Sequence, residues 1–360
     1  MERCVRAMDL PSENRISFGD EHIDAILNGG LRTRGITEIT GTAGSGKTQI
    51  CLQLCAQVQL PEKEGGLDAH AAYISTEHGF ASKRFEEICR TAVQKKRTPL
   101  TVKSMTDRVH VVRVQEADEL WETVNQACVL VQRLNVKLVV IDSLTAIFRG
   151  EFRGSSIVDM KDRAEMLLQL AATMKRCSHE HGCAFVVVNQ VTAAMSNENM
   201  FLIPSRFMSY IEQFSVKASL GMTWSNCVND RIMIHRCRHH VAEKLNAEKE
   251  NAARRNRSKE RGRLRMFHTV LSSHTSSSSV CFFRVQKEGI VGMPEDRVCL
   301  SYGGSRVIQS EEKCELLSEI VVTEEKVVAT EEERRVPVKK RIKITSTPQT
   351  TTTERAMVPC

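Results

Sequence analysis

Apolar and polar positions follow two rhythms along the chain, one typical of strands and one typical of helices. Short runs rich in β-branched residues predict buried strands at 35–40, 71–76, 137–142 and 184–189. Apolar residues at helical spacing predict helices at 22–27, 50–58, 82–91, 120–134 and 164–181. Strands that alternate with helices predict an α/β fold, with a mostly parallel sheet and helices on both of its faces.

The pattern weakens beyond Ser219. Strands are predicted at 231–235 and 263–270, and a strand at 280–285 is expected to end the ordered core. Residues 303–360 contain no Phe, Trp or Tyr and are rich in Glu, Lys, Thr and Val, which predicts a largely disordered tail. The expected organisation is therefore a short extension, a core and a tail: 1–14, 15–302 with a basic insertion at 236–263, and 303–360.

Composition narrows the class of protein. The 360 residues suffice for one α/β core of about 200 to 250 residues with extensions. Because no run approaches the roughly 18 apolar residues of a membrane helix and the amino terminus lacks an apolar signal core, we expect a soluble intracellular protein without membrane contacts. The 13 cysteines are scattered singly, as in a reducing compartment. A metal site is not expected in the cluster of His235, Cys237, His239 and His240, which lies among arginines.

The net charge of +7 is concentrated in one segment. Between Arg236 and Arg265 there are 11 lysines and arginines against 4 glutamates, a difference of 7 that equals the whole excess. A local basic block favours a polyanion such as nucleic acid, although runs of charge are also common on solvated surfaces.

A glycine-rich stretch between a predicted strand and a predicted helix matches the phosphate-binding loop GxxxxGK[ST] in full. Its residues are Gly41, Thr42, Ala43, Gly44, Ser45, Gly46, Lys47 and Thr48. The glycines allow backbone amides to curl around phosphate oxygens, Lys47 reaches the β and γ phosphates, and Thr48 can bind Mg²⁺. The motif predicts ATP and Mg²⁺ as cofactors. The alternative is a glycine-rich turn that binds no ligand.

Three polar residues follow other predicted strands. Asp142 ends the strand 137–142, where a carboxylate can hold the magnesium and its water shell. Glu77 and Gln190 follow the strands 71–76 and 184–189, so both should project from the edge of the sheet at which ligands bind in open α/β folds. Glu77 is a candidate for polarising an attacking water, and Gln190 for reporting the γ-phosphate to the following loop. For Asp142 the alternative is a solvated loop carboxylate, whereas Glu77 and Gln190 could each equally be an exposed polar residue at a strand end.

Two loops at this edge are candidates for DNA contacts. Residues 192–219 show little periodicity, and loops of such length are usually functional or disordered. Arg149, Arg153 and Lys161 lie near a shorter loop after the Asp142 strand. Basic loops beside a nucleotide site suit binding of a DNA backbone, and solvated surface charge is the alternative.

With these residues placed, the chain resembles the RecA/RadA recombinase family over about residues 15–295. The resemblance rests on five stretches: 36–49, 73–77, 139–152, 189–192 and 288–294. It implies a RecA-like ATPase core with DNA-binding loops at about 152–159 and 192–219. It also implies that Glu77 is the hydrolytic base and Gln190 the switch, and that Arg84 lies against the adenine.

The resemblance further implies a paralogue of the main recombinase, which would work in hetero-oligomers with another paralogue and assist recombination on DNA at breaks and stalled forks. Departures from the family pattern favour such an accessory role. Only about 14 residues precede Ile16, no FxxA-type oligomerisation motif is evident, and residues 271–277 lack the acidic residue that caps a neighbour's ATP. Long filaments of this chain alone are therefore not expected. The insertion at 236–263 is either an extra DNA contact or a charged surface helix.

A basic cluster in the tail fits a nuclear import signal, although such clusters also arise freely in disordered tails. Its members are Arg334, Arg335, Lys339, Lys340, Arg341 and Lys343. Three functions remain open from the sequence: an ATP-binding accessory of DNA repair with weak DNA-stimulated hydrolysis, a small-molecule phosphotransferase, and a nucleotide-gated scaffold without turnover. The phosphotransferase would need an arginine-bearing lid, for which there is no obvious candidate.

Overall fold

The computed structural model describes nine stretches of the chain: 13–77, 79–96, 98–151, 157–194, 203–212, 216–238, 241–243, 263–277 and 279–300. Most of the basic insertion and the whole of the predicted tail, with its basic cluster, lie outside the described residues. Among the described residues, no helix is both long and apolar enough to cross a membrane.

A nine-stranded sheet organises the fold, in the order β14-β13-β12-β10-β3-β7-β6-β4-β5. Six neighbouring strands are parallel: β10 (Asp230–Arg236), β3 (Ile36–Gly41), β7 (Ala184–Asn189), β6 (Val136–Asp142), β4 (His70–Ser75) and β5 (Val109–Arg113). The remaining three are antiparallel: β12 (Arg265–Leu271), β13 (Val280–Gln286) and β14 (Gly289–Met293). The predicted α/β fold with a mostly parallel sheet is confirmed.

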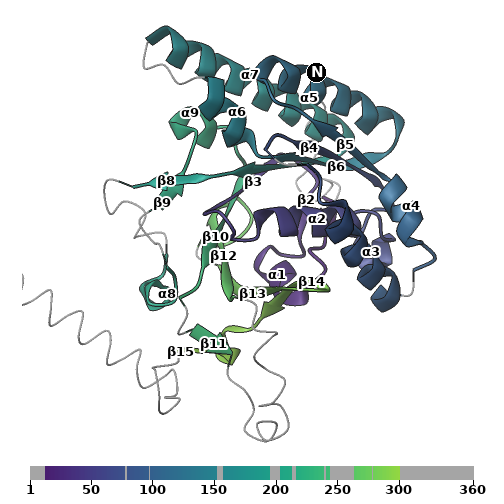
Figure 1. The fold of residues 1–360 in the computed structure, drawn as a ribbon, viewed down its shortest axis with the longest axis vertical. Helices are drawn as coiled ribbons and strands as arrows, with labels where there is room; N and C mark the ends of the chain where they lie inside the picture. Colours follow the sequence, from purple (N-terminus) through teal and green to yellow (C-terminus); the bar gives the residue numbers. More distant parts are fainter. Residues whose placement is uncertain are drawn as a thin grey trace, which may run out of the picture. The chain divides into compact units, whose positions relative to one another are not determined.

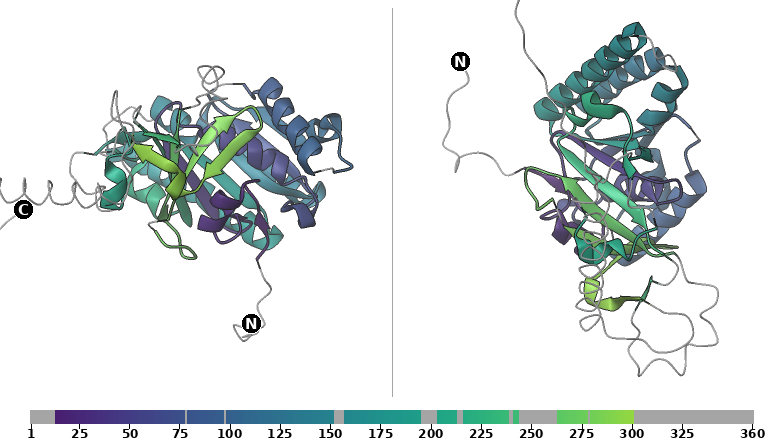
Figure 2. Two further views of the ribbon diagram at one scale, coloured as in Figure 1. Left: turned by 90° about the horizontal axis from the view of Figure 1, so that it is seen from below. Right: turned by 90° about the vertical axis from the view of Figure 1, so that its left-hand side faces the viewer.

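Helices cover the parallel strands on both faces (Figures 1 and 2). One face carries α1 (Glu21–Ile26), α2 (Lys47–Gln57) and α3 (Ser82–Lys96), and the other carries α5 (Ala117–Arg133), α6 (Leu144–Glu151), α7 (Ile157–His181) and α9 (Gly221–Ser225). The alternation of side chains along each strand explains both cores. In β7, Val186 and Val188 pack with the α2 side, whereas Phe185 and Val187 pack with the α7 side. Each such buried side chain contributes about 1.5–3 kcal/mol.

Smaller elements surround this frame. They are β1 (Arg15–Ile16) paired with β2 (Leu31–Arg32), α4 (Val102–Asp107), β8 (Val191–Ala193) paired with β9 (Val216–Ala218), α8 (Ser205–Met208), and β11 (Val241–Glu243) paired with β15 (Val298–Leu300), with short 3-10 turns at Glu62–Glu64 and Glu295–Arg297. The helix α7 ends before Gly182, whose φ of +57° is left-handed, so a glycine stops this helix where the predicted range 164–181 ends.

The structure corrects several expectations. The expected loop after Asp142 is occupied by α6, so Arg149 lies on a helix, as does Lys161 on α7. Residues 152–156, including Arg153, lie outside the described part. The stretch 192–219 is also partly regular, because β8, α8 and β9 fall within it. The core does not end at 280–285, since β14 and β15 follow.

The sequence did not predict β5 or α6, and each omission has a physical reason. The edge strand β5 exposes Val111 and Val112 by 46% and 38%, so its apolar run gives no alternation that would mark a half-buried strand. The helix α6 has eight residues, fewer than the ten or so at which helical periodicity becomes readable.

Candidate nucleotide-binding site

The glycine-rich loop has the strand–loop–helix context that its motif requires. Strand β3 ends at Gly41 and α2 begins at Lys47, with Gly46 as the left-handed residue before the helix, at a φ of +106°. Gly44 is also left-handed, and a Cβ placed on it would meet nothing within 4 Å. The loop therefore presents an open concavity of backbone at the amino terminus of a helix, an arrangement suited to phosphate.

Lys47 lies folded over this loop. Its ammonium donates to the carbonyl oxygens of Gly41 at 2.7 Å and Thr42 at 2.9 Å. Burial lowers the pKa of Lys47, and the carboxylates of Asp142 and Glu77 act in the opposite direction. The ammonium is thus positioned over the concavity of the loop, with two carboxylates close enough to influence it.

Asp142 connects the loop helix to two neighbouring strands. Its Oδ2 accepts hydrogen bonds from the Thr48 hydroxyl at 2.8 Å and from the Tyr73 hydroxyl at 2.6 Å. Burial and then the Asp142 carboxylate raise the pKa of Tyr73 far above its ordinary value, which keeps the phenol a donor. Adjacent hydroxyl and carboxylate oxygens are hard ligands of the type that Mg²⁺ prefers. The Thr48 and Asp142 side chains therefore fit the predicted magnesium.

Glu77 and Gln190, which come from separate strands, lie in contact. The Gln190 amide nitrogen donates to Glu77 Oε1 at 2.5 Å, and the Ser143 hydroxyl donates to the same oxygen at 3.0 Å. Ser143 is itself fixed, because its backbone N–H donates to the buried Thr76 hydroxyl at 2.8 Å. The peptide bond between Asp142 and Ser143 is cis. The carboxyl ends of β4, β6 and β7 therefore bring both predicted residues to one place.

Arg149 extends this contact toward the second candidate loop. One of its guanidinium nitrogens donates to Gln190 Oε1 at 2.8 Å, and another donates to the Ser219 hydroxyl at 3.0 Å. Ser219 directly follows β9, and its backbone N–H donates to the Gln190 carbonyl at 3.0 Å. The hydrogen bonds Glu77–Gln190–Arg149–Ser219 therefore run from the edge of the candidate nucleotide site to the base of the β8–β9 pair.

The residues that fix this run of hydrogen bonds in place were not identified from the sequence. Glu38 lies fully buried in β3 and accepts hydrogen bonds from the Asn189 amide at 2.6 Å and the Trp224 indole at 2.9 Å. It also forms an ion pair with Arg231. Asn189 donates further to the Ser219 carbonyl at 3.1 Å. A glutamate within an otherwise uncharged, buried strand is the one signal that could have marked this network, because a buried carboxylate needs partners.

Arg84 connects α3 to two other elements. Its guanidinium donates to Gln49 at 2.7 Å, to Glu87 at 2.8 Å, and to the carbonyls of Gln286 and Lys287 at 2.5 and 2.8 Å. Arg84 thus holds the β13–β14 turn against the loop helix. Its predicted place against the adenine stays a prediction, since these contacts concern only the protein.

Arg265, at the start of β12, is a further cation beside the loop that the sequence did not single out. Its guanidinium approaches the Gly44 carbonyl at 3.4 Å, and burial lowers its pKa. The buried Nε of Arg265 has no hydrogen-bond partner among the described residues. Arg265 adds positive charge beside the loop, close to Gly44 and Gly46.

The remaining expectations concern metal and the capping segment. Within the described ranges no three His, Cys, Asp or Glu side chains are grouped so as to bind a metal ion. His239 and His240 lie outside those ranges, whereas His235 and Cys237 are buried in the fold. In the segment 271–277, the His274 carbonyl accepts from the Asn28 amide at 2.7 Å, which ties the segment to the turn after α1.

Comparison with known proteins gives consistent matches. The family model described as Rad51 matches residues 13–207. The chain is 34% identical to the DNA repair protein XRCC3 of Bos taurus over 285 residues, which cover 78% of this chain and 75% of the relative. It is 30% identical to the XRCC3 homolog of Arabidopsis thaliana, with 78% and 93% covered, and 29% identical to the DNA repair protein rhp57 of Schizosaccharomyces pombe, with 61% and 68% covered.

Proposed function

This chain belongs to the Rad51 family, and from that membership and the site geometry we propose that it is an ATP-binding recombinase paralogue that assists homologous-recombination repair of DNA breaks. The resemblance to RecA/RadA recombinases that the motifs indicated is confirmed by the same matches. The relatives are DNA repair proteins, and the same process is proposed for this chain.

The observation that carries the proposal is the run of hydrogen bonds Glu77–Gln190–Arg149–Ser219. It begins beside the loop that we propose for the triphosphate and ends at the base of β9, which bounds the candidate DNA loop. Gln190 links the two halves of this run, because its amide nitrogen donates to Glu77 and its carbonyl oxygen accepts from Arg149. A triphosphate that displaces Glu77 from Gln190 would thereby alter the contacts at the base of the DNA loop.

The roles of the individual side chains follow from their positions. Lys47 and the backbone of the loop bind the β and γ phosphates, and Thr48 with Asp142 holds Mg²⁺, which supplies charge neutralisation when bound. Tyr73 orients the Asp142 carboxylate. Glu77, whose Oε1 accepts from Gln190 and Ser143, orients and deprotonates the attacking water.

Partners and location belong to the same proposal. The chain works with another recombinase paralogue and the main recombinase on single-stranded or branched DNA in the nucleus. Co-purification of the tagged chain from cells, followed by identification of bound proteins, should recover Rad51-family members, and their absence would contradict this part.

The test of the site compares two variants of the full chain by calorimetric titration with ATP and Mg²⁺. Lys47→Ala removes the phosphate-binding ammonium and should weaken ATP binding by at least about tenfold, whereas Glu77→Gln keeps the shape and should retain binding but lose hydrolysis. Lys103→Ala, at an exposed site away from the loop, is the matched control. Unchanged ATP affinity in Lys47→Ala would refute the proposed nucleotide site.

Repair assays in cells that carry only one variant distinguish a function that needs ATP hydrolysis from one that needs only nucleotide binding. If Glu77→Gln supports repair as well as the wild type, the chain acts as a nucleotide-gated scaffold. If Glu77→Gln fails like Lys47→Ala, hydrolysis is part of the function.

A further inference from the structure

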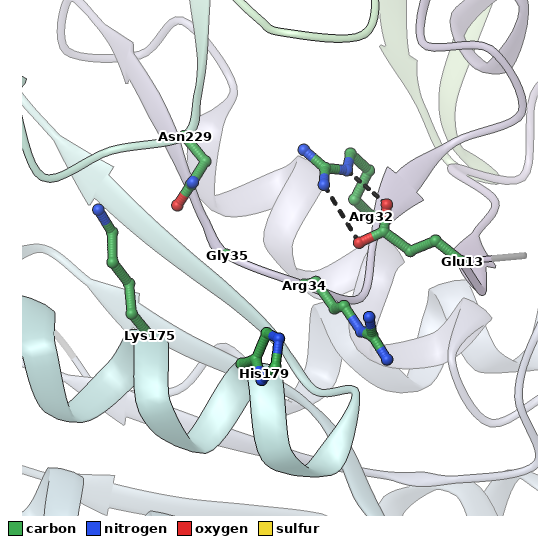
Figure 3. A pocket seen from close by; sticks show the side chains of 7 residues that line it. All are labelled: Glu13, Arg32, Arg34, Gly35, Lys175, His179 and Asn229. Carbon is green, nitrogen blue, oxygen red and sulfur yellow. Dashed lines mark hydrogen bonds and ion pairs between the residues drawn. The ribbon is translucent and has the colours of Figure 1, made fainter. Parts of the chain in front are cut away.

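A pocket lined mainly by polar residues (Figure 3) lies at the amino end of β3, whereas the glycine-rich loop follows the carboxyl end of the same strand. It has a volume of about 480 Å³, which is within the range of ligand pockets. The six residues of β3 separate the pocket from the loop by roughly 20 Å, at about 3.3 Å per residue. A ligand here would therefore touch neither Lys47 nor Asp142.

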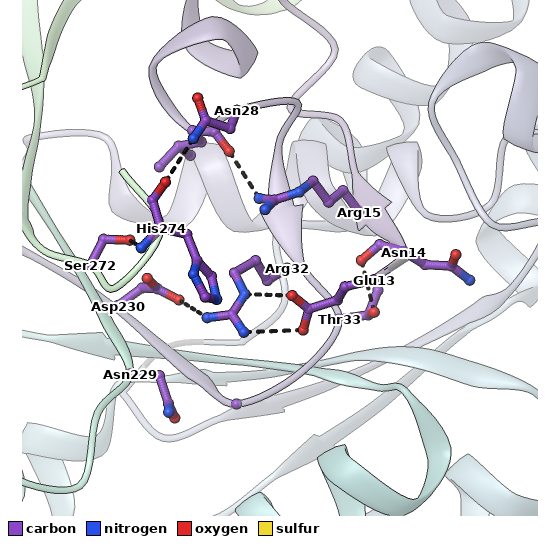
Figure 4. Close-up of polar contacts among 12 residues, drawn as sticks. Glu13, Asn14, Arg15, Asn28, Arg32, Thr33, Asn229, Asp230, Ser272 and His274 are labelled. Atoms are coloured by element: carbon purple, nitrogen blue, oxygen red, sulfur yellow. Dashed lines mark hydrogen bonds and ion pairs between the residues drawn. The ribbon is translucent and has the colours of Figure 1, made fainter. Parts of the chain in front are cut away.

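The lining of this pocket has an excess of positive charge. Arg32, Arg34 and Lys175 face it with a single carboxylate, that of Glu13. Glu13 is already used, because both of its oxygens accept from Arg32 at 2.7 and 3.2 Å (Figure 4). Arg32 also pairs with Asp230 at 3.5 Å. The carboxylates near the pocket therefore neutralise Arg32 only.

Arg34 and Lys175 have no ion pair or side-chain hydrogen bond within the described part of the chain, and the same holds for His179. Lys175 and His179 lie one turn apart on α7; the Lys175 amine extends toward Asn229, and Arg34 lies beside His179 (Figure 3). Lys175 precedes the last turn of α7, and His179 lies within it. Uncompensated positive charges that face one pocket repel each other, and an anion between them removes the repulsion.

The floor of the pocket is rigidly built. Asn229 Oδ1 accepts from the Ile36 backbone N–H at 2.9 Å, so the oxygen is occupied and the amide NH₂ is left as a donor. Gly35 is left-handed at a φ of +88°, and a Cβ on it would come within 2.7 Å of the Asn229 amide. The Gly35 N–H donates to Ser178 Oγ on α7 at 2.7 Å. These contacts fix the strand end against the helix that carries Lys175 and His179.

We propose that this pocket, which we call the α7 pocket, binds acidic side chains from a peptide segment of a partner protein. Two cations, an imidazole and an amide donor suit carboxylate or phosphate-ester oxygens. The proposal does not depend on the nucleotide site, which is at the other edge of the sheet.

The charges around the α7 pocket favour a peptide over nucleic acid. A nucleic-acid backbone places phosphates in a row and needs a row of cations to match it. Two neighbouring cations on this edge are engaged, because Arg108 pairs with Asp68 at 2.8 Å and Lys137 donates to the His181 carbonyl at 2.6 Å. Arg34 and Lys175 instead line one compact pocket, as the recognition of a few acidic side chains requires.

The test uses the full chain and a fluorescein-labelled hexaglutamate peptide, with binding followed by fluorescence anisotropy. The double variant Arg34→Glu, Lys175→Glu should bind the peptide at least about tenfold more weakly than the wild type. The matched control is Arg90→Glu, Lys103→Glu, two exposed cations outside the pocket, which should change the affinity by less than about twofold. Equal ATP affinity and equal urea midpoints show that the double variant is folded.

A second readout locates the peptide. Saturating hexaglutamate should protect Lys175 from acetylation, read by mass spectrometry, and leave Lys103 reactive. Unchanged peptide affinity in the double variant, or an equal loss in the control, would overturn the proposal. Protection of Lys175 by oligothymidylate instead of hexaglutamate would assign the pocket to nucleic acid, and protection by inorganic phosphate alone would assign it to a small anion. Both results would also overturn the proposal.

Discussion

Glu38 provides the sharpest test of the energetics behind this site. Its carboxylate is fully buried and joins β3, which ends at the glycine-rich loop, to Asn189 at the end of β7, Trp224 on α9 and Arg231 on β10. We expect Glu38→Ala to destabilise the core strongly, because it leaves three donors without this acceptor.

The magnitude can be worked from these contacts. Removing one partner of a buried ion pair costs about 3–5 kcal/mol, and an unsatisfied buried donor such as the Trp224 indole adds about 1–3 kcal/mol. The Arg231 side chain keeps 13% exposure and a hydrogen bond to Ser225 Oγ at 3.1 Å, which limits the penalty. The expected loss is therefore at the low end, about 4 kcal/mol, a large part of a stability of about 5–15 kcal/mol.

Urea unfolding of the full chain, followed by tryptophan fluorescence, measures the loss. Glu62→Ala, at an exposed glutamate, should change the free energy of unfolding by less than about 0.5 kcal/mol. In a double-mutant cycle, Arg231→Met should cost less in the Glu38→Met background than alone, because no unpaired carboxylate remains. A loss below about 1 kcal/mol in the free energy of unfolding of Glu38→Ala would refute the reasoning that this network fixes β3 to β7 and β10.

Three further predictions concern the nucleotide site itself. Tyr73→Phe removes the hydrogen bond to Asp142 and should lower the free energy of unfolding by about 1 kcal/mol in urea, with no change if the hydroxyl is unimportant. The pKa of Lys47 is lowered from its ordinary value of 10.5, and only the ammonium form attracts phosphate, so ATP affinity should fall as the pH rises through this lowered pKa. In Lys47→Arg the fall should vanish over the same pH range. Arg84→Ala should weaken the binding of ATP but not of inorganic triphosphate in calorimetry. Equal losses of affinity for both ligands would contradict the predicted contact between Arg84 and the adenine.

The sequence was sufficient where local pattern and motif agreed. The loop from Gly41 to Thr48 carries its own strand and helix signals, and Glu77, Asp142 and Gln190 end parallel strands whose carboxyl edges must coincide. What the pattern could not give was the order of the strands, and hence the direct contact between Glu77 and Gln190, because β4 and β7 are separated in the sheet by β6.

The missed features depend on contacts between distant parts of the chain. Arg149 follows Asp142 by a few residues, yet its role comes from Gln190 and Ser219, which arrive on other elements. Arg265 reaches the loop only because β12 runs antiparallel beside β10. The α7 pocket joins Arg34 to residues that lie about 140 positions later, a proximity that no local pattern encodes.

The most direct test is whether the binding of ATP and the binding of DNA are coupled. Affinity for a labelled oligothymidylate should be measured by anisotropy in the absence and presence of a nonhydrolysable ATP analogue with Mg²⁺. The wild type should bind DNA about tenfold more tightly with the analogue, as should Gln169→Ala, an exposed control on α7. Gln190→Ala should bind both ligands without this gain. A gain of the same size in Gln190→Ala, or none in the wild type, would contradict the account.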